Sequence, residues 1–411
     1  MLVVIFTAAS AQALQPLAQF FAAARNANTD ARRAALTTVR READALAARG
    51  ELLPSLAVNG TYTRNQYASS LSTPAGTVDV QPETAIDGSA QFSVPLLDLS
   101  TLSKARAANA EVSVAKLSEQ EMLLEVDRQI ARSYFELIGA EALRRSACVS
   151  LDAAEQSLAT AEIRRDAGSA TDLDVARAAV EVERAKGNIA AEALAIALAR
   201  RSLQTLSCLV PEENVPELEA DDLRDELPLA GWEERVSTLP SVLVAAESTR
   251  AREHEASAAR FALAPKVGMT VSQNVTNPAG LVGHSGYFTG LVTLSWRFDV
   301  PARARIRSQD AAVAVARVEQ EAAANRARDD VHEAWQRVFN GIVTSRVARS
   351  QTAAAQLAAK TARERYEAGA GTQLELIQAQ RDLSSTEASR IQADANLALA
   401  RTLLRLAVGD Y

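Results

Sequence analysis

The chain has 411 residues, of which 48% are hydrophobic and 23% are charged, so it is not a disordered chain and is long enough for a large core or for two units. The formal net charge of −7 argues against nucleic acid as the main partner, because phosphate binding needs a basic surface. No metal cluster or cofactor site is predicted from three His and three Met residues, and no disulfide is predicted for Cys148 and Cys208, which both lie in helix-like sequence.

Residues 1–13 are predicted to be a secretory signal peptide. The stretch from Leu2 to Ala9 is a short apolar run, and Ala11-Gln12-Ala13 fits a cleavage site with small residues on both sides. The basic start of a signal peptide is missing, so a buried N-terminal segment is the alternative. Elsewhere the sequence has no apolar run of about 18 residues, and we therefore expect no membrane-spanning helix.

The sequence repeats itself once. With a shift of 201 residues, Gly168 aligns with Gly369, and the match continues without a gap on both sides. A period of this length indicates a duplicated domain and not a solenoid of short repeats. We predict a first structural repeat at 14–210, a linker at 211–235 and a second structural repeat at 236–411.

Near the start of each repeat the shift becomes 211 residues, because Pro54 aligns with Pro265. The ten-residue difference (211 − 201) predicts that the intervals of about 54–98 and 265–299 are β-hairpins whose connections differ in length. Their connecting stretches, ASSLSTPAGTVDVQPET and TNPAGLVGHSG, are rich in Gly, Ser and Thr, which is typical of exposed loops.

The last predicted strand alternates most clearly. Its apolar face would carry Phe288, Val292, Leu294, Trp296 and Phe298, and its polar face would carry Thr289, Thr293, Ser295 and Arg297. Such faces either pack on a soluble core or face lipid around a polar lumen. Four strands cannot close a barrel with an open lumen, and lipid-exposed edges are not tolerated, so several chains would have to share one barrel. Three chains would supply twelve strands (3 × 4).

A very long helix is predicted after each hairpin. Residues 102–167 contain no Pro and a single Gly, Gly139, and residues 302–368 contain no Pro and a single Gly, Gly341. A helix of 66 residues (102 to 167) would be on the order of 100 Å long at a rise of ~1.5 Å per residue. A rod of this length needs neighbouring helices, as in coiled coils.

Each long helix runs into the same short motif, RRDAGSATDLDV at 164–175 and RYEAGAGTQLEL at 365–376. Gly168 and Gly369 are expected to end the long helices in the left-handed conformation. Both motifs also keep Arg, Ala-Gly and Leu at the same places, which a simple end of a helix does not require. We therefore predict a docking function for these turns.

A second helix is predicted to start directly after each turn. Thr171 with Asp174, and Thr372 with Glu375, have the spacing of a capping box, in which each residue binds the backbone of the other. Each half is therefore expected to form an antiparallel helical hairpin. The return helices are predicted at about 171–207 and 372–406.

These features resemble the outer-membrane efflux proteins of the TolC type over nearly the whole chain, from about Leu17 to Leu406. The resemblance rests on the duplicated order of elements, on LLPSLAVNGTYT and LAPKVGMTVSQN before the hairpins, and on SVPLLD and SWRFD after them. The turn motifs RRDAGSATDLDVARA and RYEAGAGTQLELIQAQ resemble the most diagnostic stretch of the family. The implied fold is mainly α, with duplicated long α-helical hairpins forming a trimeric α-barrel and four β-strands per chain contributing to a 12-stranded membrane barrel.

The resemblance also implies a location, a function and partners. The protein would be a homotrimer in contact with lipid in the cell outer membrane, with its helical barrel in the periplasm. It would conduct substrates passively to the exterior for a tripartite efflux or type I secretion system, engaged by a periplasmic membrane-fusion adaptor and an inner-membrane transporter. In the family the hairpin tips meet the adaptor, and the matching residues are Gly168, Thr171, Leu173, Gly369, Thr372 and Leu374.

The periplasmic entrance would lie at Asp174, Glu375 and Gln378 by the same resemblance. Three Glu375 side chains around a threefold axis would form a negative ring that attracts cations, and the alternative is that Glu375 only caps its helix. Gln378 stands where a second acid is often found, so a double acidic ring is not expected. Gly371 stands where a larger polar residue is sometimes found, so no latch through this side chain is expected.

Two other classes of protein are weaker alternatives. A soluble periplasmic coiled-coil scaffold would also contain long helices, but it would extract into the soluble fraction and not as a membrane trimer. No Ser/His/Asp, P-loop or Rossmann pattern supports an enzyme. His254 and His332 lie in helical sequence and His284 lies in a loop, and Trp232 is expected in the core.

Overall fold

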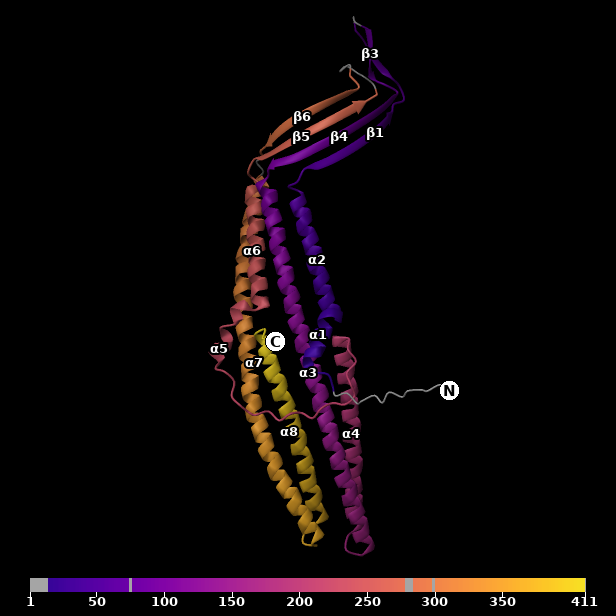
Figure 1. Cartoon of the computed structure of the whole chain (residues 1–411), viewed down its shortest axis with the longest axis vertical. Coiled ribbons are helices and arrows are strands. Elements are labelled where there is room, and N and C mark those ends of the chain that lie inside the picture. Colours follow the sequence, from indigo (N-terminus) through magenta and orange to yellow (C-terminus); the bar gives the residue numbers. More distant parts are fainter. Residues whose placement is uncertain (1–13, 74–75, 278–283, 298–299, 411) are drawn as a thin grey trace, which may run out of the picture. The chain divides into compact units, whose positions relative to one another are not determined.

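A computed structural model describes the chain over four ranges, and the fold is mainly helical with a small number of strands (Figure 1). The predicted signal peptide at 1–13 and Phe298 of the last predicted strand lie outside the described residues. The four ranges are 14–73, 76–277, 284–297 and 300–410.

Each half of the chain follows the predicted order of helix, hairpin, long helix, turn and return helix. The predicted ends of the long and return helices differ from the observed ends by three residues at most. The first half contains α1 (Leu17–Ala27), α2 (Thr29–Gly50), β1 (Ser55–Arg64), β2 (Ser69–Thr73), β3 (Gly76–Gln81), β4 (Thr84–Leu97), α3 (Leu99–Asp166) and α4 (Asp172–Ser207). The second half contains α5 (Leu229–Glu233), a single 3-10 turn (Val236–Thr238), α6 (Pro240–Phe261), β5 (Lys266–Thr276), β6 (Gly286–Ser295), α7 (Val300–Glu367) and α8 (Gln373–Ala407).

The first hairpin is longer because it carries an additional two-stranded ribbon. β1 pairs with β4 over all ten of its residues, and between them β2 pairs with β3. The prediction of an exposed loop in ASSLSTPAGTVDVQPET is therefore wrong for most of this stretch. Its Gly, Ser and Thr residues favour turns, but a β-ladder needs only backbone N–H and C=O groups, which any non-proline residue supplies.

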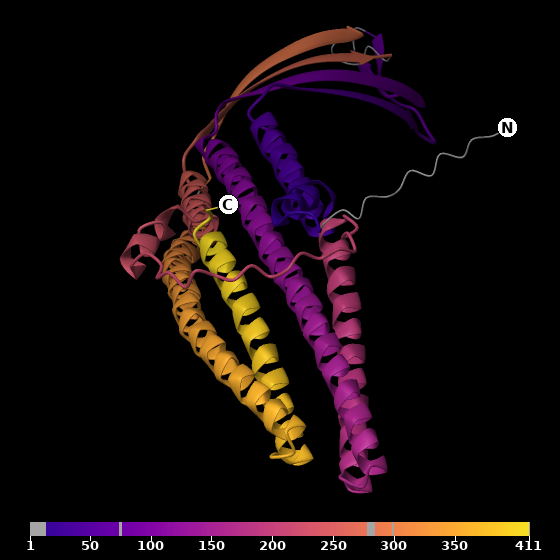
Figure 2. The same cartoon turned by 60° about the horizontal axis from the view of Figure 1, so that its bottom comes forward.

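Residues 36–117 and 243–322 form one compact unit, which contains a four-stranded sheet in the order β1-β4-β5-β6. All three pairings are antiparallel, and Figure 2 shows the strands lying side by side in one curved layer. β1 and β6 are the edges of this sheet and have one strand neighbour each in the described part of the chain. Edge strands expose unpaired backbone groups, which lipid cannot satisfy.

The register sorts the side chains of the sheet onto two chemically different faces. Val292 lies opposite Met269, whereas its neighbour Thr293 lies opposite Gly268. The predicted alternation is therefore confirmed, with Leu291 as an exception on the polar face. Because the apolar face is exposed and not packed on a core of its unit, the lipid-facing interpretation of these strands is favoured. The exposed apolar side chains on this face are Leu56, Val58, Tyr62, Ile86, Phe92, Leu97, Val271, Val275, Phe288, Val292 and Leu294.

Residues 14–35, 118–242 and 323–410 form the second compact unit, which is helical. In this unit α3 turns back into α4, and α7 turns back into α8 (Figure 1). The unit has two hydrophobic cores in its described residues, one of which contains Phe20 and the other Trp232. Trp232 is thereby confirmed as a core residue, and it lies within α5. No helix in the described part of the chain has both the length and the apolar composition needed to cross a membrane.

The single glycine of each long helix lies where α8 approaches closely. A Cβ atom at Gly341 would stand 3.2 Å from Cδ1 of the fully buried Leu397, and a Cβ atom at Gly139 would stand 3.4 Å from Cβ of Ala395. Glycine is unfavourable inside a helix by roughly 0.5–1 kcal/mol relative to alanine, so the close packing of α8 offsets a local cost.

Candidate functional site

The first hairpin tip has the geometry that its sequence predicts. Gly168 has a φ of +73°, and its N–H donates to the carbonyl oxygen of Arg165 at 2.8 Å. Thr171 Oγ1 accepts from the N–H of Asp174 at 3.3 Å, and the Asp174 carboxylate accepts from the N–H of Thr171 at 3.1 Å, which completes the capping box. Hydrogen bonds from the side chain and backbone of Thr171 lower the pKa of Asp174, so the cap is ionised at neutral pH.

The second tip repeats this construction. Gly369 has a φ of +75°, and Thr372 and Glu375 form the second capping box, with N···O distances of 3.2 and 3.3 Å. Glycine is favoured at position 371 for a steric reason, because a Cβ atom there would stand 3.1 Å from the backbone nitrogen of Tyr366. A larger residue at 371 would push against the preceding turn, which explains the absence of a side chain that could act as a latch.

The remaining predicted tip residues point outward. Leu173 is 57% exposed and Leu374 is 42% exposed, although both are large apolar residues in the first turn of a helix. Gln378 and Glu375 are also exposed. Two leucines at equivalent positions thus leave much of their apolar surface uncovered, and the docking function predicted for the tips stays a prediction with this geometry in its favour.

The two tips are tied to each other by Arg164, the arginine that both motifs keep, although its contact with the other hairpin was not predicted. From the end of α3, Arg164 Nη2 donates to the carbonyl oxygens of Tyr366 at 2.7 Å and Glu367 at 3.2 Å. Its guanidinium carbon lies 4.0 Å from the centroid of the Tyr366 ring. The equivalent Arg365 instead donates to the carbonyl oxygen of Ala370 in its own turn, at 3.3 Å. One repeated arginine therefore closes a turn and the other joins the hairpins.

Further polar contacts join the hairpins above the turns. Arg381 of α8 forms an ion pair with Glu181 of α4, and Gln373 donates to Ser157 of α3 at 3.0 Å in a buried position. Tyr366 is itself buried, and its hydroxyl has no hydrogen-bond partner among the described residues. Burial raises the pKa of Tyr366, so this hydroxyl stays neutral.

The segment between the repeats, residues 209–228, is held against both hairpins and is called the strap below. On the first hairpin, Arg200 of α4 donates to the carbonyl oxygen of Glu213 at 2.8 Å. On the second hairpin, Trp335 Nε1 of α7 donates to the carbonyl oxygen of Leu227 at 3.0 Å. The strap therefore connects the two halves structurally as well as in sequence.

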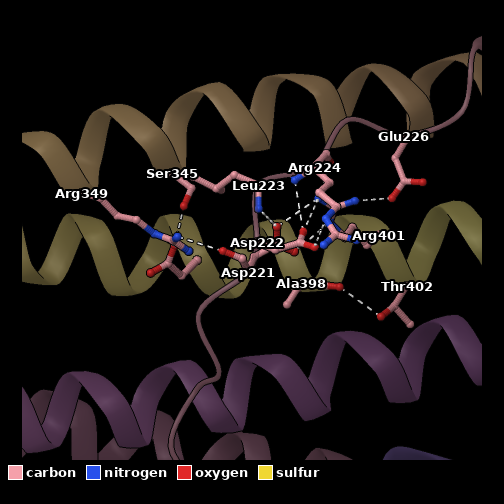
Figure 3. A network of polar contacts seen from close by, with 11 residues as sticks. Asp221, Asp222, Leu223, Arg224, Glu226, Ser345, Arg349, Ala398, Arg401 and Thr402 are labelled. Carbon is pink, nitrogen blue, oxygen red and sulfur yellow. Dashed lines mark hydrogen bonds and ion pairs between the residues drawn. The ribbon is translucent and has the colours of Figure 1, made fainter.

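Arg401 of α8 is the centre of the polar network that fixes the strap (Figure 3). Its guanidinium donates to both carboxylate oxygens of Asp221, at 2.7 and 3.0 Å, to the carbonyl oxygen of Arg224 at 2.7 Å, and to Glu226. Burial by itself lowers the pKa of Arg401, but the hydrogen bonds that its guanidinium donates to Asp221 and Glu226 raise the pKa overall. Arg401 is therefore a fully charged clamp that binds two carboxylates directly and has a third, Asp222, at 4.0 Å.

A second arginine extends the network along α7. Arg349 donates to the carbonyl oxygen of Asp221 at 2.9 Å and to the carboxylate of Asp394 at 2.9 Å. Asp394 is buried and also accepts a hydrogen bond from Ser345. Through Arg349 and Asp394 the strap is thus tied to the packing of α7 on α8.

Comparison with known proteins matches this architecture to one family. The family described as outer membrane efflux protein matches residues 21–207 and 237–410, which leaves the N-terminal residues and the whole strap outside the match. A relative is the outer membrane efflux protein BepC of Brucella suis biovar 1 (strain 1330), with 23% identity over 266 residues. That match covers 63% of this chain and 58% of the relative, so it spans just over half of the relative's length.

Solved structures share the fold across almost the whole chain. A membrane protein from Pseudomonas aeruginosa is 23% identical, with a TM-score of 0.84 and coverage of 96% of this chain and 93% of the other. The outer membrane protein VceC of Vibrio cholerae is 14% identical, with a TM-score of 0.82 and coverage of 96% of both chains. At these identities the likeness establishes the fold, including the helical hairpins and the antiparallel sheet.

Proposed function

Because the chain belongs to the outer membrane efflux protein family, we propose that it is the outer-membrane exit duct of a tripartite efflux system and conducts solutes passively from the periplasm to the exterior. An outer-membrane location and a channel role in efflux are those of the family. The observation that carries the proposal is the four-stranded sheet, which has an exposed apolar face, a polar face and two edges without a further strand in the described chain. Such a sheet is stable in lipid only when other copies close it into a barrel.

A homotrimer is the assembly that we propose, because three copies of four strands make a twelve-stranded barrel (3 × 4). Exposed apolar side chains on the helices support a ring in which one surface of each copy meets a different surface of the next. In the unit that contains the sheet, these residues are Leu36, Val39 and Leu46 of α2 and Val315 and Val318 of α7. In the helical unit they are Val180, Leu194 and Leu198 of α4 and Phe339, Val343 and Val347 of α7.

The tips are proposed to receive a periplasmic adaptor that links the duct to an inner-membrane transporter. Leu173 and Leu374 support this role because they are exposed apolar side chains at equivalent places of two rigid, capped helix starts. Gly168, Thr171, Gly369 and Thr372 would act indirectly, by setting the shape of the turns that present the leucines. No catalytic role is proposed for any residue.

We further propose that the closed entrance is held by the contacts between the tips. We expect the double variant Arg164→Ala, Arg381→Ala to raise the open probability of single channels by about tenfold or more, since each of three copies loses the two hydrogen bonds and the ring contact of Arg164 and the ion pair of Arg381. The matched control is Arg184→Ala, which removes a partner of the same Glu181 from within α4. Unchanged open probability in the double variant would contradict a gate at the tips.

The ring of charge proposed for the entrance can be separated from helix capping. Glu375→Gln keeps a side-chain acceptor for the N–H of Thr372 but removes the charge, whereas Glu375→Ala removes both. We expect both variants to move the reversal potential in a potassium chloride gradient toward lower cation selectivity. If only Glu375→Ala has an effect, or neither has, then Glu375 is a cap and the ring is wrong.

Reconstitution of the purified full chain tests the function itself. We expect a heat-modifiable trimer in the membrane fraction that produces discrete conductance steps in planar lipid bilayers. A monomer in the soluble fraction without such steps would overturn the proposal in favour of the soluble periplasmic scaffold.

A further inference from the structure

A cavity whose charged side chains are mostly cations lies where the sheet meets the helices. It has a volume of about 760 Å³ and is bounded by the starts of α3 and α7, the end of α6, and the ends of β5 and β6 that lie nearest to them. Its charged lining consists of Lys104, Lys266, Arg297, Arg305 and a single acid, Glu255. We call it the basic cavity. All of these residues belong to the unit that contains the sheet.

The register of the sheet shows on which face the basic cavity opens. Lys266 lies opposite Ser295 on the polar face of the sheet, and both residues line the cavity. The next pair along the ladder, Val267 and Leu294, belongs to the opposite, apolar face. In the proposed barrel the polar face surrounds the lumen and the apolar face meets lipid. The cavity therefore opens toward the path of the solute and not toward the acyl chains.

Two of the cations in the cavity have no ion-pair partner in the part of the chain that the structure describes, namely Lys104 and Arg297. Lys266 is partly neutralised by an ion pair, since its Nζ lies 2.7 Å from the carboxylate of Asp98. The acid Glu255 is already paired with Arg252 at 2.8 Å, so it does not neutralise the cavity. Each copy thus presents an excess of positive charge to the same space, although the whole chain carries a net charge of −7.

The duplication contributes to this arrangement. Lys104 and Arg305 occupy equivalent positions of the two repeats (305 − 104 = 201), one at the start of each long helix. They converge on one cavity because both helices begin beside the sheet. Arg297 has no basic counterpart, since Leu96 stands at the equivalent position of the first repeat. The cavity is therefore a feature of the complete chain and is not built by either repeat alone.

We propose that the basic cavity binds the anionic groups of permeating solutes, such as phosphate or carboxylate, at the neck between the helical and β portions of the duct. This inference rests on the proposed function, because it places the cavity in the lumen. Clustered cations in a partly enclosed space attract anions more strongly than isolated surface charges, since low-dielectric walls focus the field. The duct would thereby favour solutes that carry negative charge.

Inorganic pyrophosphate, a compact anion, is the probe for the test. We expect equilibrium dialysis to detect its binding to the purified wild-type trimer, and we expect Lys104→Gln, Arg297→Gln to weaken this binding by about tenfold, or about threefold for each single variant. The matched control is Arg40→Gln, Arg49→Gln, which removes the same charge from exposed positions of α2 in the same unit and should stay within about twofold of wild type.

Conductance measurements decide where the site lies. Pyrophosphate should reduce the single-channel conductance of wild type and of the α2 control. The cavity variant should need a higher pyrophosphate concentration for the same reduction. Three outcomes would each overturn the inference. The first is that pyrophosphate does not bind to wild type, and the second is that it binds to the cavity variant with equal affinity. The third is that it binds without blocking the channel, which would place the anion on the lipid side. Discrete channels that are insensitive to pyrophosphate leave the exit-duct proposal intact, whereas absence of any channel refutes both.

Discussion

We expect Arg401→Ala to lower the free energy of unfolding of the helical unit by about 3 kcal/mol, which is the range for breaking a largely buried ion network by removing one partner. The side chain of Arg401 is only 16% exposed, and its loss would leave Asp221 and Glu226 with similarly low exposure and without their cation. It would also remove the donor to the carbonyl oxygen of Arg224. The strap would then be held to the second hairpin mainly by Arg349 and Trp335.

Guanidinium unfolding of the detergent-solubilised protein, followed by helical circular dichroism, would measure this loss. Arg401→Lys keeps the charge but cannot bind both carboxylates in the fork geometry of arginine, so we expect it to restore stability only in part. Arg235→Ala is the control, because its pair with Asp410 is exposed and should contribute less than about 1 kcal/mol. Equal stability of Arg401→Ala and wild type would show that the strap adds no measurable stability.

The network at the strap could not be predicted from the sequence. Residues 211–235 were predicted only as a linker, although they contain the acidic run DDLRDE. The partner of Asp221 is Arg401, 180 residues further along the chain. Hydrophobic periodicity and local motifs describe neighbours within a few turns of a helix, so they carry no information about an ion pair at this separation.

At the tips the sequence predicted what is local and missed what crosses between hairpins. The glycine conformations and both capping boxes depend on residues within six positions of each other, and they are confirmed. Arg164 and Arg365 occupy the same place in one motif, yet only Arg164 reaches the other hairpin. The difference arises because Tyr366 provides a ring and a carbonyl for Arg164, whereas the first tip has Arg165 at the position of Tyr366.

The sheet shows the same division between local and distant information. Alternation along the last strand predicted two faces, and the pairing confirms them. The neighbours of each strand depend on contacts between the two halves, such as β4 with β5, which the repeat pattern alone does not specify. The β2–β3 ribbon was missed because its sequence favours turns. What the alternation does specify is which side chains would face lipid, and this can be tested one residue at a time.

Val292→Arg should strongly reduce the amount of folded trimer in the membrane. Val292 lies in β6 on the apolar face, opposite Met269, and 67% of its surface is exposed. An arginine on the lipid face of a barrel costs about 2–4 kcal/mol near the bilayer midplane, and a homotrimer would contain the substitution three times. The heat-modifiable trimer band in outer-membrane fractions, measured by gel electrophoresis of unheated samples, reports the loss.

The neighbouring residue provides a control that differs only in its face of the sheet. Thr293 lies opposite Gly268, which leaves room for a longer side chain, and it points to the polar face that would surround the lumen. Thr293→Arg should therefore assemble at nearly the wild-type level, and its effect should appear in ion selectivity instead. If Val292→Arg and Thr293→Arg reduced the trimer equally, or neither did, the apolar face would not be in contact with lipid, and the duct would have to be placed elsewhere on the molecule.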